Sequence, residues 1–272
     1  MGKKLICAIL VLTTAAGFSG CNIEIERNNS GNSKEGIIKD DGERSYYTES
    51  FETKDINKIY LDLQVANVEI YTTDNGLFKV ERNCNEKIYG SITAKQEGNT
   101  IKVVEPDLKI KVNNIKDIDE VKNDIKIGIP KEYAGNIDFD YGVGKCTVSD
   151  ISADKFDMEC GVGDVYIDNL TFNDLSMELG VGQTKINLNK SGKMDILGGV
   201  GATEIKIKEV GGDLDFEGGV GAANIYIPAN SPVRFKTETG IGACSTDVAT
   251  SGENTYVFDL STGVGAIKVK EL

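Results

Sequence analysis

The stretch CGVGDVYIDNL, residues 160–170, places two glycines around a valine and continues as a short alternating run of apolar and polar residues. The pattern occurs seven times in the second half of the chain, always with Val or Ile between the glycines, and its first glycines are 19, 19, 19, 20, 21 and 23 residues apart. Such a step is typical of one coil of a β-solenoid and is too short for a propeller blade. The glycines are Gly142, Gly144, Gly161, Gly163, Gly180, Gly182, Gly199, Gly201, Gly219, Gly221, Gly240, Gly242, Gly263 and Gly265.

The apolar alternation changes phase at these glycines. Phe156 and Met158 precede the first glycine of one copy by odd intervals, whereas Val165 and Ile167 follow it by even intervals. Successive side chains of a strand point to opposite faces, so one face stays inward only if the chain bends or bulges here. Glycine allows the unusual backbone angles and the close backbone approach that a bend needs. We therefore predict that the glycines are structural corners, with the central valine in the core.

Stacked coils of this kind share one continuous core. The sequence therefore predicts an all-β protein, with a parallel β-solenoid of GVG repeats over residues 136–272. Alternating runs such as KIYLDLQVANVEIY, residues 58–71, predict an irregular β part or cap over residues 51–135. A twisted β-sandwich built from hairpins of the same period is the alternative.

Residues 1–20 have the features of an export signal. Lys3 and Lys4 precede an apolar run that is too short to span a bilayer, and the run ends in FSGC, residues 18–21. Small residues directly before a cysteine resemble the cleavage site of bacterial lipoprotein signal peptides, which implies that Cys21 is lipidated. We expect an extracytoplasmic protein anchored by lipid to the cell membrane. The polar residues 21–50 predict a flexible tether after this anchor.

The composition restricts the functions open to the chain. The formal net charge is -13, and removal of Lys3 and Lys4 with the signal lowers it to -15, so nucleic acid is a poor partner. The chain has no His, which excludes His-dependent nucleophilic catalysis and removes the commonest metal ligand. Four cysteines remain in the expected mature chain. The repeat places Cys146, Cys160 and Cys244 at inward positions of different coils, so we predict small buried side chains without disulfides, and Cys84 has no assignable partner.

Acidic residues recur two and four positions before the first glycine of the copies. They are Asp138, Asp140, Asp157, Glu159, Glu178, Asp195, Asp215, Glu217, Glu238 and Asp259. Stacking would align them as an acidic ladder, and rows of like charge on neighbouring strands repel each other. One hypothesis is weak binding of divalent cations or of a basic polymer, and the other is a solvated face that prevents aggregation. We predict no cofactor and no dedicated metal site.

The same ladder bears on catalysis. Neighbouring carboxylates at about 5 Å are compatible with a retaining glycosidase pair. The arrangement recurs along the whole stack without singling out one pair, and the chain has no Trp for stacking against sugars. We therefore expect a protein that is not an enzyme.

The opening F-x-x-x-x-I-x-K-I-x-L-x-L at residues 51–63, followed by the GVG copies, resembles a bacterial family of unknown function labelled "putative adhesin". The resemblance covers residues 51–272. It implies a β-strand-repeat domain on a secreted or membrane-tethered protein and offers no catalytic residues. The resulting hypothesis is a surface module that contacts cell-wall polymer, an envelope protein or a host surface. The alternatives are an envelope-stress sensor or regulatory scaffold acting through a membrane partner, and a polysaccharide-processing enzyme.

Overall fold

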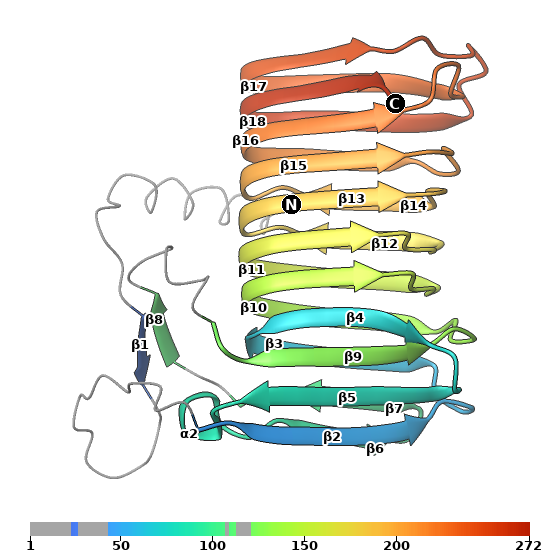
Figure 1. Ribbon diagram of the computed structural model, residues 1–272. Coiled ribbons are helices and arrows are strands. Elements are labelled where there is room, and N and C mark those ends of the chain that lie inside the picture. The colour runs from blue at the N-terminus through green and yellow to red at the C-terminus, as the bar shows by residue number, and fades with distance from the viewer. Residues whose placement is uncertain (1–22, 27–42, 107–108, 113–120) are drawn as a thin grey trace.

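The computed structural model describes residues 23–26, 43–106, 109–112 and 121–272, and in these residues the protein is all-β apart from one short helix (Figure 1). The expectation of an all-β protein is therefore confirmed. The expected signal segment, Cys21 and much of the expected tether lie outside the described residues. No helix in the described part of the chain is long and apolar enough to cross a membrane.

The elements before the repeats form the lower part of the molecule in Figure 1. They are β1 (Ile23–Glu26), β2 (Ser45–Glu52), β3 (Lys58–Val65), β4 (Asn67–Thr73), β5 (Leu77–Cys84), α2 (Glu86–Tyr89), β6 (Thr93–Glu97), β7 (Thr100–Val104), β8 (Lys109–Val112) and β9 (Asp124–Pro130). Antiparallel pairs β2–β5, β5–β9, β6–β7 and β1–β8 lie beside the parallel pairs β3–β7 and β4–β9. Parallel and antiparallel pairing are therefore mixed in this part of the chain.

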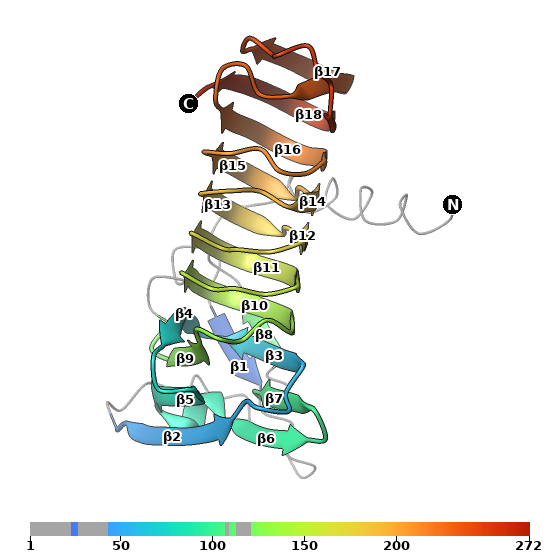
Figure 2. The same ribbon diagram turned by 90° about the vertical axis from the view of Figure 1, so that its right-hand side faces the viewer.

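The repeats form a stack above this part (Figures 1 and 2). Their strands are β10 (Asn136–Ser149), β11 (Lys155–Asp168), β12 (Asp174–Glu178), β13 (Val181–Leu188), β14 (Lys193–Leu197), β15 (Val200–Ile207), β16 (Leu214–Ile227), β17 (Val233–Asp247) and β18 (Tyr256–Glu271). All pairings among them are parallel, and each joins equivalent residues of two copies, as in Val162 with Val143. Hairpins, which the sandwich alternative requires, would pair antiparallel.

The long strands run through the glycine bend and link the two faces of the stack. β11 pairs with β12 before the bend and with β13 after it, and β16 likewise contacts β14 and β15. The strands β11, β12, β14, β16, β15 and β13 therefore form a closed ring of six parallel strands. A closed ring has no free sheet edge within it, which protects the middle of the stack from edge pairing.

The two glycines of each copy meet different requirements at the bend. The second glycines have φ between 138° and 155°, a conformation that residues with a side chain rarely adopt. A Cβ on Gly163 would lie 1.7 Å from the Gly144 carbonyl oxygen of the preceding copy, and one on Gly161 would lie 2.3 Å from the Gly142 carbonyl oxygen. Neighbouring backbones thus approach too closely for any side chain at these two positions.

The central residue of each copy does not fill the core, and that part of the prediction is wrong. Val181 and Val264 are 38 % exposed and Ile241 is 76 % exposed. The central valines of the other four copies are half-buried. The glycines absorb the change of phase themselves, which leaves the residue between them on the outer side of the bend. The core is instead built from columns on the two faces, of which Phe139, Met158 and Phe216 occupy one.

The expected tether is also partly wrong. Ser45–Glu52 forms the strand β2, which pairs antiparallel along its whole length with β5, and Ile23–Glu26 forms β1. The physical reason is visible in β2, where Tyr47 and Phe51 lie on the same face of the strand, four residues apart, and pack against the main core. Phe51 also contacts the ring of Phe78, with 6.2 Å between the ring centroids. The strand covers an edge that β5 would otherwise expose.

Candidate functional site: an acidic face

The predicted acidic positions fall into two adjacent columns on one face of the stack. Strand pairing places Tyr60, Asp138, Asp157, Ser176, Asp195, Asp215, Asp259 and Lys236 in the first column. It places Asp62, Asp140, Glu159, Glu178, Leu197, Glu217, Ser261 and Glu238 in the second. All ten predicted carboxylates thus belong to these columns, which Ser, Leu and Lys interrupt. We call this surface the acidic face.

Carboxylates are densest where β10, β11 and β12 lie side by side. A hollow of about 440 Å³ there is lined by Tyr60, Asp138, Phe139, Asp140, Asp157, Met158, Glu159, Ser176 and Glu178. Phe139 and Met158 are buried, so the side chains that border the hollow toward solvent are mainly acidic. Five carboxylates around one hollow form the strongest concentration of negative charge on this face.

The carboxylates nearest β3 already have partners. Lys58 forms an ion pair with Asp138, and the Tyr60 hydroxyl donates a hydrogen bond of 2.9 Å to Oδ2 of Asp140. Burial and this bond raise the pKa of Tyr60 to about 12, so the hydroxyl keeps its proton. Sequence reasoning missed Tyr60, because its strand lacks the GVG glycines, although the alternation of residues 58–65 extends the same column.

The next carboxylates along the stack have no such partners. Asp157, Glu159 and Glu178 form no ion pair with any described residue. Burial raises the pKa of Asp157, and the charge of Asp138 raises it further. Burial also raises the pKa of Glu159, with added repulsion from Glu178 and Asp140. The face therefore holds negative charges that destabilise one another and that a bound cation would stabilise.

Within the described residues, no group of three or more Cys, Asp or Glu side chains is arranged to hold a metal ion. The columns instead offer pairs of carboxylates on neighbouring strands, spaced by about 4.8 Å along the stack. Such a row suits several separate monovalent groups, for example ammonium or guanidinium groups on one polymer, better than one chelated ion. Because the carboxylate pairs repeat along the described stack, none of them is distinguished from the others as the acid and nucleophile of a glycosidase.

The face beyond the bend is different in character. Lys145 and Lys185 lie over the ring of Tyr166, at 5.2 and 5.7 Å from its centroid, and Lys206 and Lys270 lie over Tyr226 at 5.6 and 5.9 Å. The amines on this face are therefore partly engaged by aromatic rings.

The cysteines do not add a reactive site. Cys84, Cys146, Cys160 and Cys244 are free thiols, which for the last three agrees with the predicted absence of disulfides. Cys146 is fully buried, and burial raises the pKa of its thiol and of the Cys160 thiol, which disfavours the nucleophilic thiolate. Cys160 and Cys244 are only half-buried, which departs from the expected full burial.

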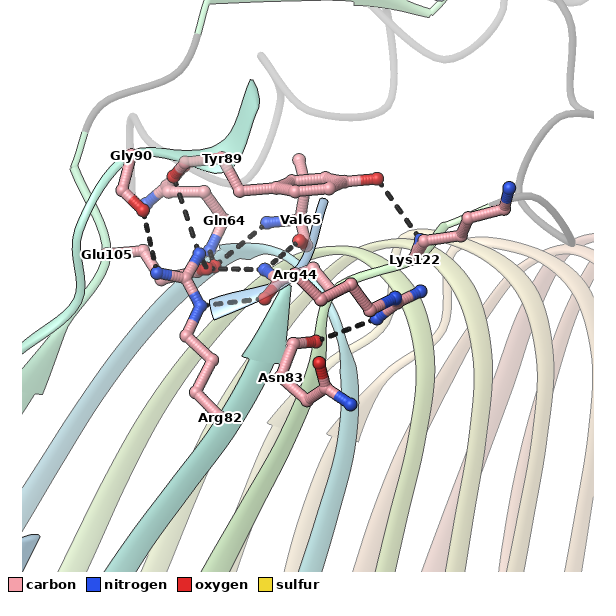
Figure 3. Close-up of polar contacts among 10 residues, drawn as sticks. Arg44, Gln64, Val65, Arg82, Asn83, Tyr89, Gly90, Glu105 and Lys122 are labelled. Carbon is pink, nitrogen blue, oxygen red and sulfur yellow. Dashed lines mark hydrogen bonds and ion pairs between the residues drawn. The ribbon is translucent and has the colours of Figure 1, made fainter. Parts of the chain in front are cut away.

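A second titratable cluster lies where the lower part of the molecule meets the glycine bends (Figure 3). Arg82 and Glu105 form an ion pair of 2.8 Å with side-chain exposures of 1 % and 0 %. Arg82 also donates to Oδ1 of Asn123 at 2.7 Å and to the Gly90 carbonyl at 2.8 Å, and Glu105 accepts from the Gln64 amide at 2.8 Å. The cluster is closed to solvent, and we assign it a structural role in fixing the first bend of the stack.

Comparisons with known proteins find similar folds only. No family model and no curated protein matches the chain. A putative cell adhesion protein from Clostridium sporogenes is similar to this chain, with 18 % identity, 85 % of this chain and 100 % of that chain covered, and a TM-score of 0.47. A putative adhesin from Bacteroides fragilis has 21 % identity over 83 % of this chain and 97 % of that chain, with a TM-score of 0.43. A putative lipid binding protein from Parabacteroides distasonis has 15 % identity over 84 % and 96 %, with a TM-score of 0.36. At these values the similarities assign no function to this chain.

Proposed function

We propose that the protein is a non-enzymatic surface protein, anchored by lipid at Cys21, which presents a rigid parallel β-solenoid and binds a basic partner with its acidic face. The partner is a polymer or protein of the cell wall, the envelope or a host surface that carries spaced cationic groups. The observation that carries this proposal is the group of carboxylates Asp157, Glu159 and Glu178, which border the hollow without an ion pair to any residue that the structure describes.

The energetic argument starts from repulsion. Like charges directly opposite each other on neighbouring strands destabilise a sheet, and the chain repeats this arrangement from coil to coil. A partner with regularly spaced cations removes the repulsion at several positions together. Single surface ion pairs contribute only about 0–1 kcal/mol, so useful affinity requires many of them on one partner. A rigid stack loses little conformational entropy when it binds such a partner.

The solenoid assignment is supported by the parallel, in-register pairing of successive copies and by the glycine bends that they share. The lipid anchor rests on the sequence FSGC alone. Together they would place the acidic face outside the cell, at a distance from the membrane surface.

The test is binding of the full-length chain, in non-ionic detergent, to intact cells, isolated cell wall and immobilised host matrix at increasing salt. The informative variant is Asp157→Asn/Glu159→Gln/Glu178→Gln. Its matched control is Glu52→Gln/Glu132→Gln/Glu253→Gln, which removes the same number of exposed charges elsewhere.

We expect saturable binding to one of these surfaces that weakens with salt, is lost in the first variant and is kept in the control. Equal binding by both variants would refute the role of the acidic face. Absence of saturable binding to every surface would refute the adhesive function.

A further inference from the structure

The two ends of the stack differ. At the lower end, β2 and β6 pair antiparallel with their neighbours, whereas β17 forms the upper end and, among the described residues, pairs only with β18 (Figure 1). β17 is outermost because β18, the later strand, inserts between it and β16. Its 15 residues therefore present one unpaired row of backbone donors and acceptors.

The side chains of β17 also indicate a surface that is not yet covered. Thr237 and Thr246 belong to the core columns of Leu260 and Val269, yet both threonines are exposed, because no described strand covers the last coil from above. Ile241, at the bend, is the most exposed of the large apolar side chains in the described chain, at 76 %.

We propose that a second copy of the chain covers this edge, with the two β17 strands paired antiparallel and the stacks joined end to end. The two-fold axis passes through the bend at Gly240–Gly242, perpendicular to the stack. Rotation about this axis places the arm before the bend in one copy over the arm after the bend in the other. Because both copies use the same edge, the contact closes as a dimer and does not continue into a filament.

The phase change at the bend restricts the register of this pairing. Inward residues must lie opposite inward residues, since a slip by one residue would reverse every side chain. Phe235 and Thr237 face inward before the bend, and Cys244 and Thr246 face inward after it. In the two registers nearest the bend that satisfy this condition, Asp247 lies opposite Arg234 or opposite Lys236. In both, Glu238 lies opposite an uncharged residue, Ala243 or Ser245. The edge is thus complementary in charge to itself.

The existing contacts favour the register with Arg234. Lys236 already forms an ion pair of 3.3 Å with Asp259, whereas Arg234 forms none with any described residue. Arg can also bind a carboxylate in a bidentate manner. In either register the two Ile241 residues lie beside the axis, opposite Gly240 or Gly242, where apolar contact would exclude water.

Sedimentation velocity of the full-length chain in non-ionic detergent, over a wide range of concentration, tests this proposal. The variants are Arg234→Glu and Asp247→Arg, each alone and in an equimolar mixture. Lys193→Glu, a charge reversal on the exposed side of β14 in the middle of the stack, is the control.

The wild type and Lys193→Glu should form dimers. Each reversal alone should raise the dissociation constant by about tenfold or more, because two opposite-charge pairs become two like-charge pairs. The mixture should recover the wild-type constant, since the two variants complement each other at both pairs, and an unfolded variant could not produce this rescue. A monomeric wild type, dimerisation insensitive to both reversals, or a mixture without recovery would each overturn the proposal.

Discussion

Replacement of Gly182 by Ala tests the structural basis of the repeat. Gly182 has φ +147°, and its added Cβ would lie 1.8 Å from the Gly163 carbonyl oxygen. Real Cβ contacts are essentially never below 3.0 Å, so the backbones of β11 and β13 would have to separate by more than 1 Å at the bend. The matched control is Gly252→Ala, where φ is +81° and nothing lies within 4 Å of the added Cβ.

The size of the effect follows from two contributions. An unfavourable φ costs about 1–2 kcal/mol for a residue with a side chain, and both variants bear this cost. Only Gly182→Ala also weakens the pairing between copies, and each hydrogen bond lost there costs about 1 kcal/mol. We expect the free energy of unfolding to fall by about 3 kcal/mol or more in Gly182→Ala and by about 1 kcal/mol in the control.

Thermal unfolding followed by circular dichroism provides the assay. A loss of 3 kcal/mol lowers the melting temperature of a chain of this size by about 6–12 °C, and the control loses about 2–4 °C. Equal losses in the two variants would refute the inference that close stacking of the backbones, and not φ alone, requires glycine at the bend.

Three further outcomes are expected. Glu105→Leu should lower the free energy of unfolding in urea by about 3–5 kcal/mol, because it leaves the Arg82 charge buried without its carboxylate. Arg82→Met/Glu105→Leu should lower it by less. A larger decrease in the double variant would contradict the structural role of the pair. Acidification from neutral pH to about pH 5 should stabilise the wild type relative to Asp157→Asn/Glu159→Gln/Glu178→Gln, measured as the difference in melting temperature. The sign follows from the raised pKa of Asp157 and Glu159, because the folded state binds those protons more tightly than the unfolded state; a difference that does not change with pH would disprove the repulsion. Cys21→Ser should move the protein from the membrane fraction to the soluble fraction of fractionated cells, and unchanged membrane association would rule out the lipid anchor.

The all-β class and the two core faces could be predicted because their signal in the sequence is redundant. Seven copies show the same phase change at the same two glycines, and the alternation on each side identifies the core columns that contain Phe156 and Ile167. The alignment of the acidic positions follows from the same period. These features depend on local backbone geometry and on the side-chain alternation of strands, both of which can be read from sequence.

Other features of the fold depend on tertiary contacts, which the repeat period of the sequence does not specify. Whether the residue between two glycines faces inward depends on the local shape of the bend, which the period does not specify, and the alternation alone therefore places Val181 wrongly in the core. β2 is short and mostly polar, so it resembles a tether in sequence, and neither its pairing with β5 nor the packing of Tyr47 and Phe51 against the core follows from the repeat period. Cys146 and Cys244 lie five copies apart in sequence but six strands apart in the stack, since β18 inserts before β17. Arg82 and Glu105 are separated by 23 residues, with nothing in the pattern to connect them.

The most direct test of the acidic face is calorimetric titration of the full-length chain with oligolysines of increasing length. Neighbouring strands of the columns are about 4.8 Å apart, and carboxylates occupy most of their positions. A longer oligomer therefore engages more carboxylates, and we expect the affinity to rise with length until the face is covered. The Glu52→Gln/Glu132→Gln/Glu253→Gln control should behave as the wild type, whereas Asp157→Asn/Glu159→Gln/Glu178→Gln should bind weakly at every length. An affinity that does not depend on length, or that is the same in the two variants, would show that general negative charge, and not an ordered row of carboxylates, determines binding.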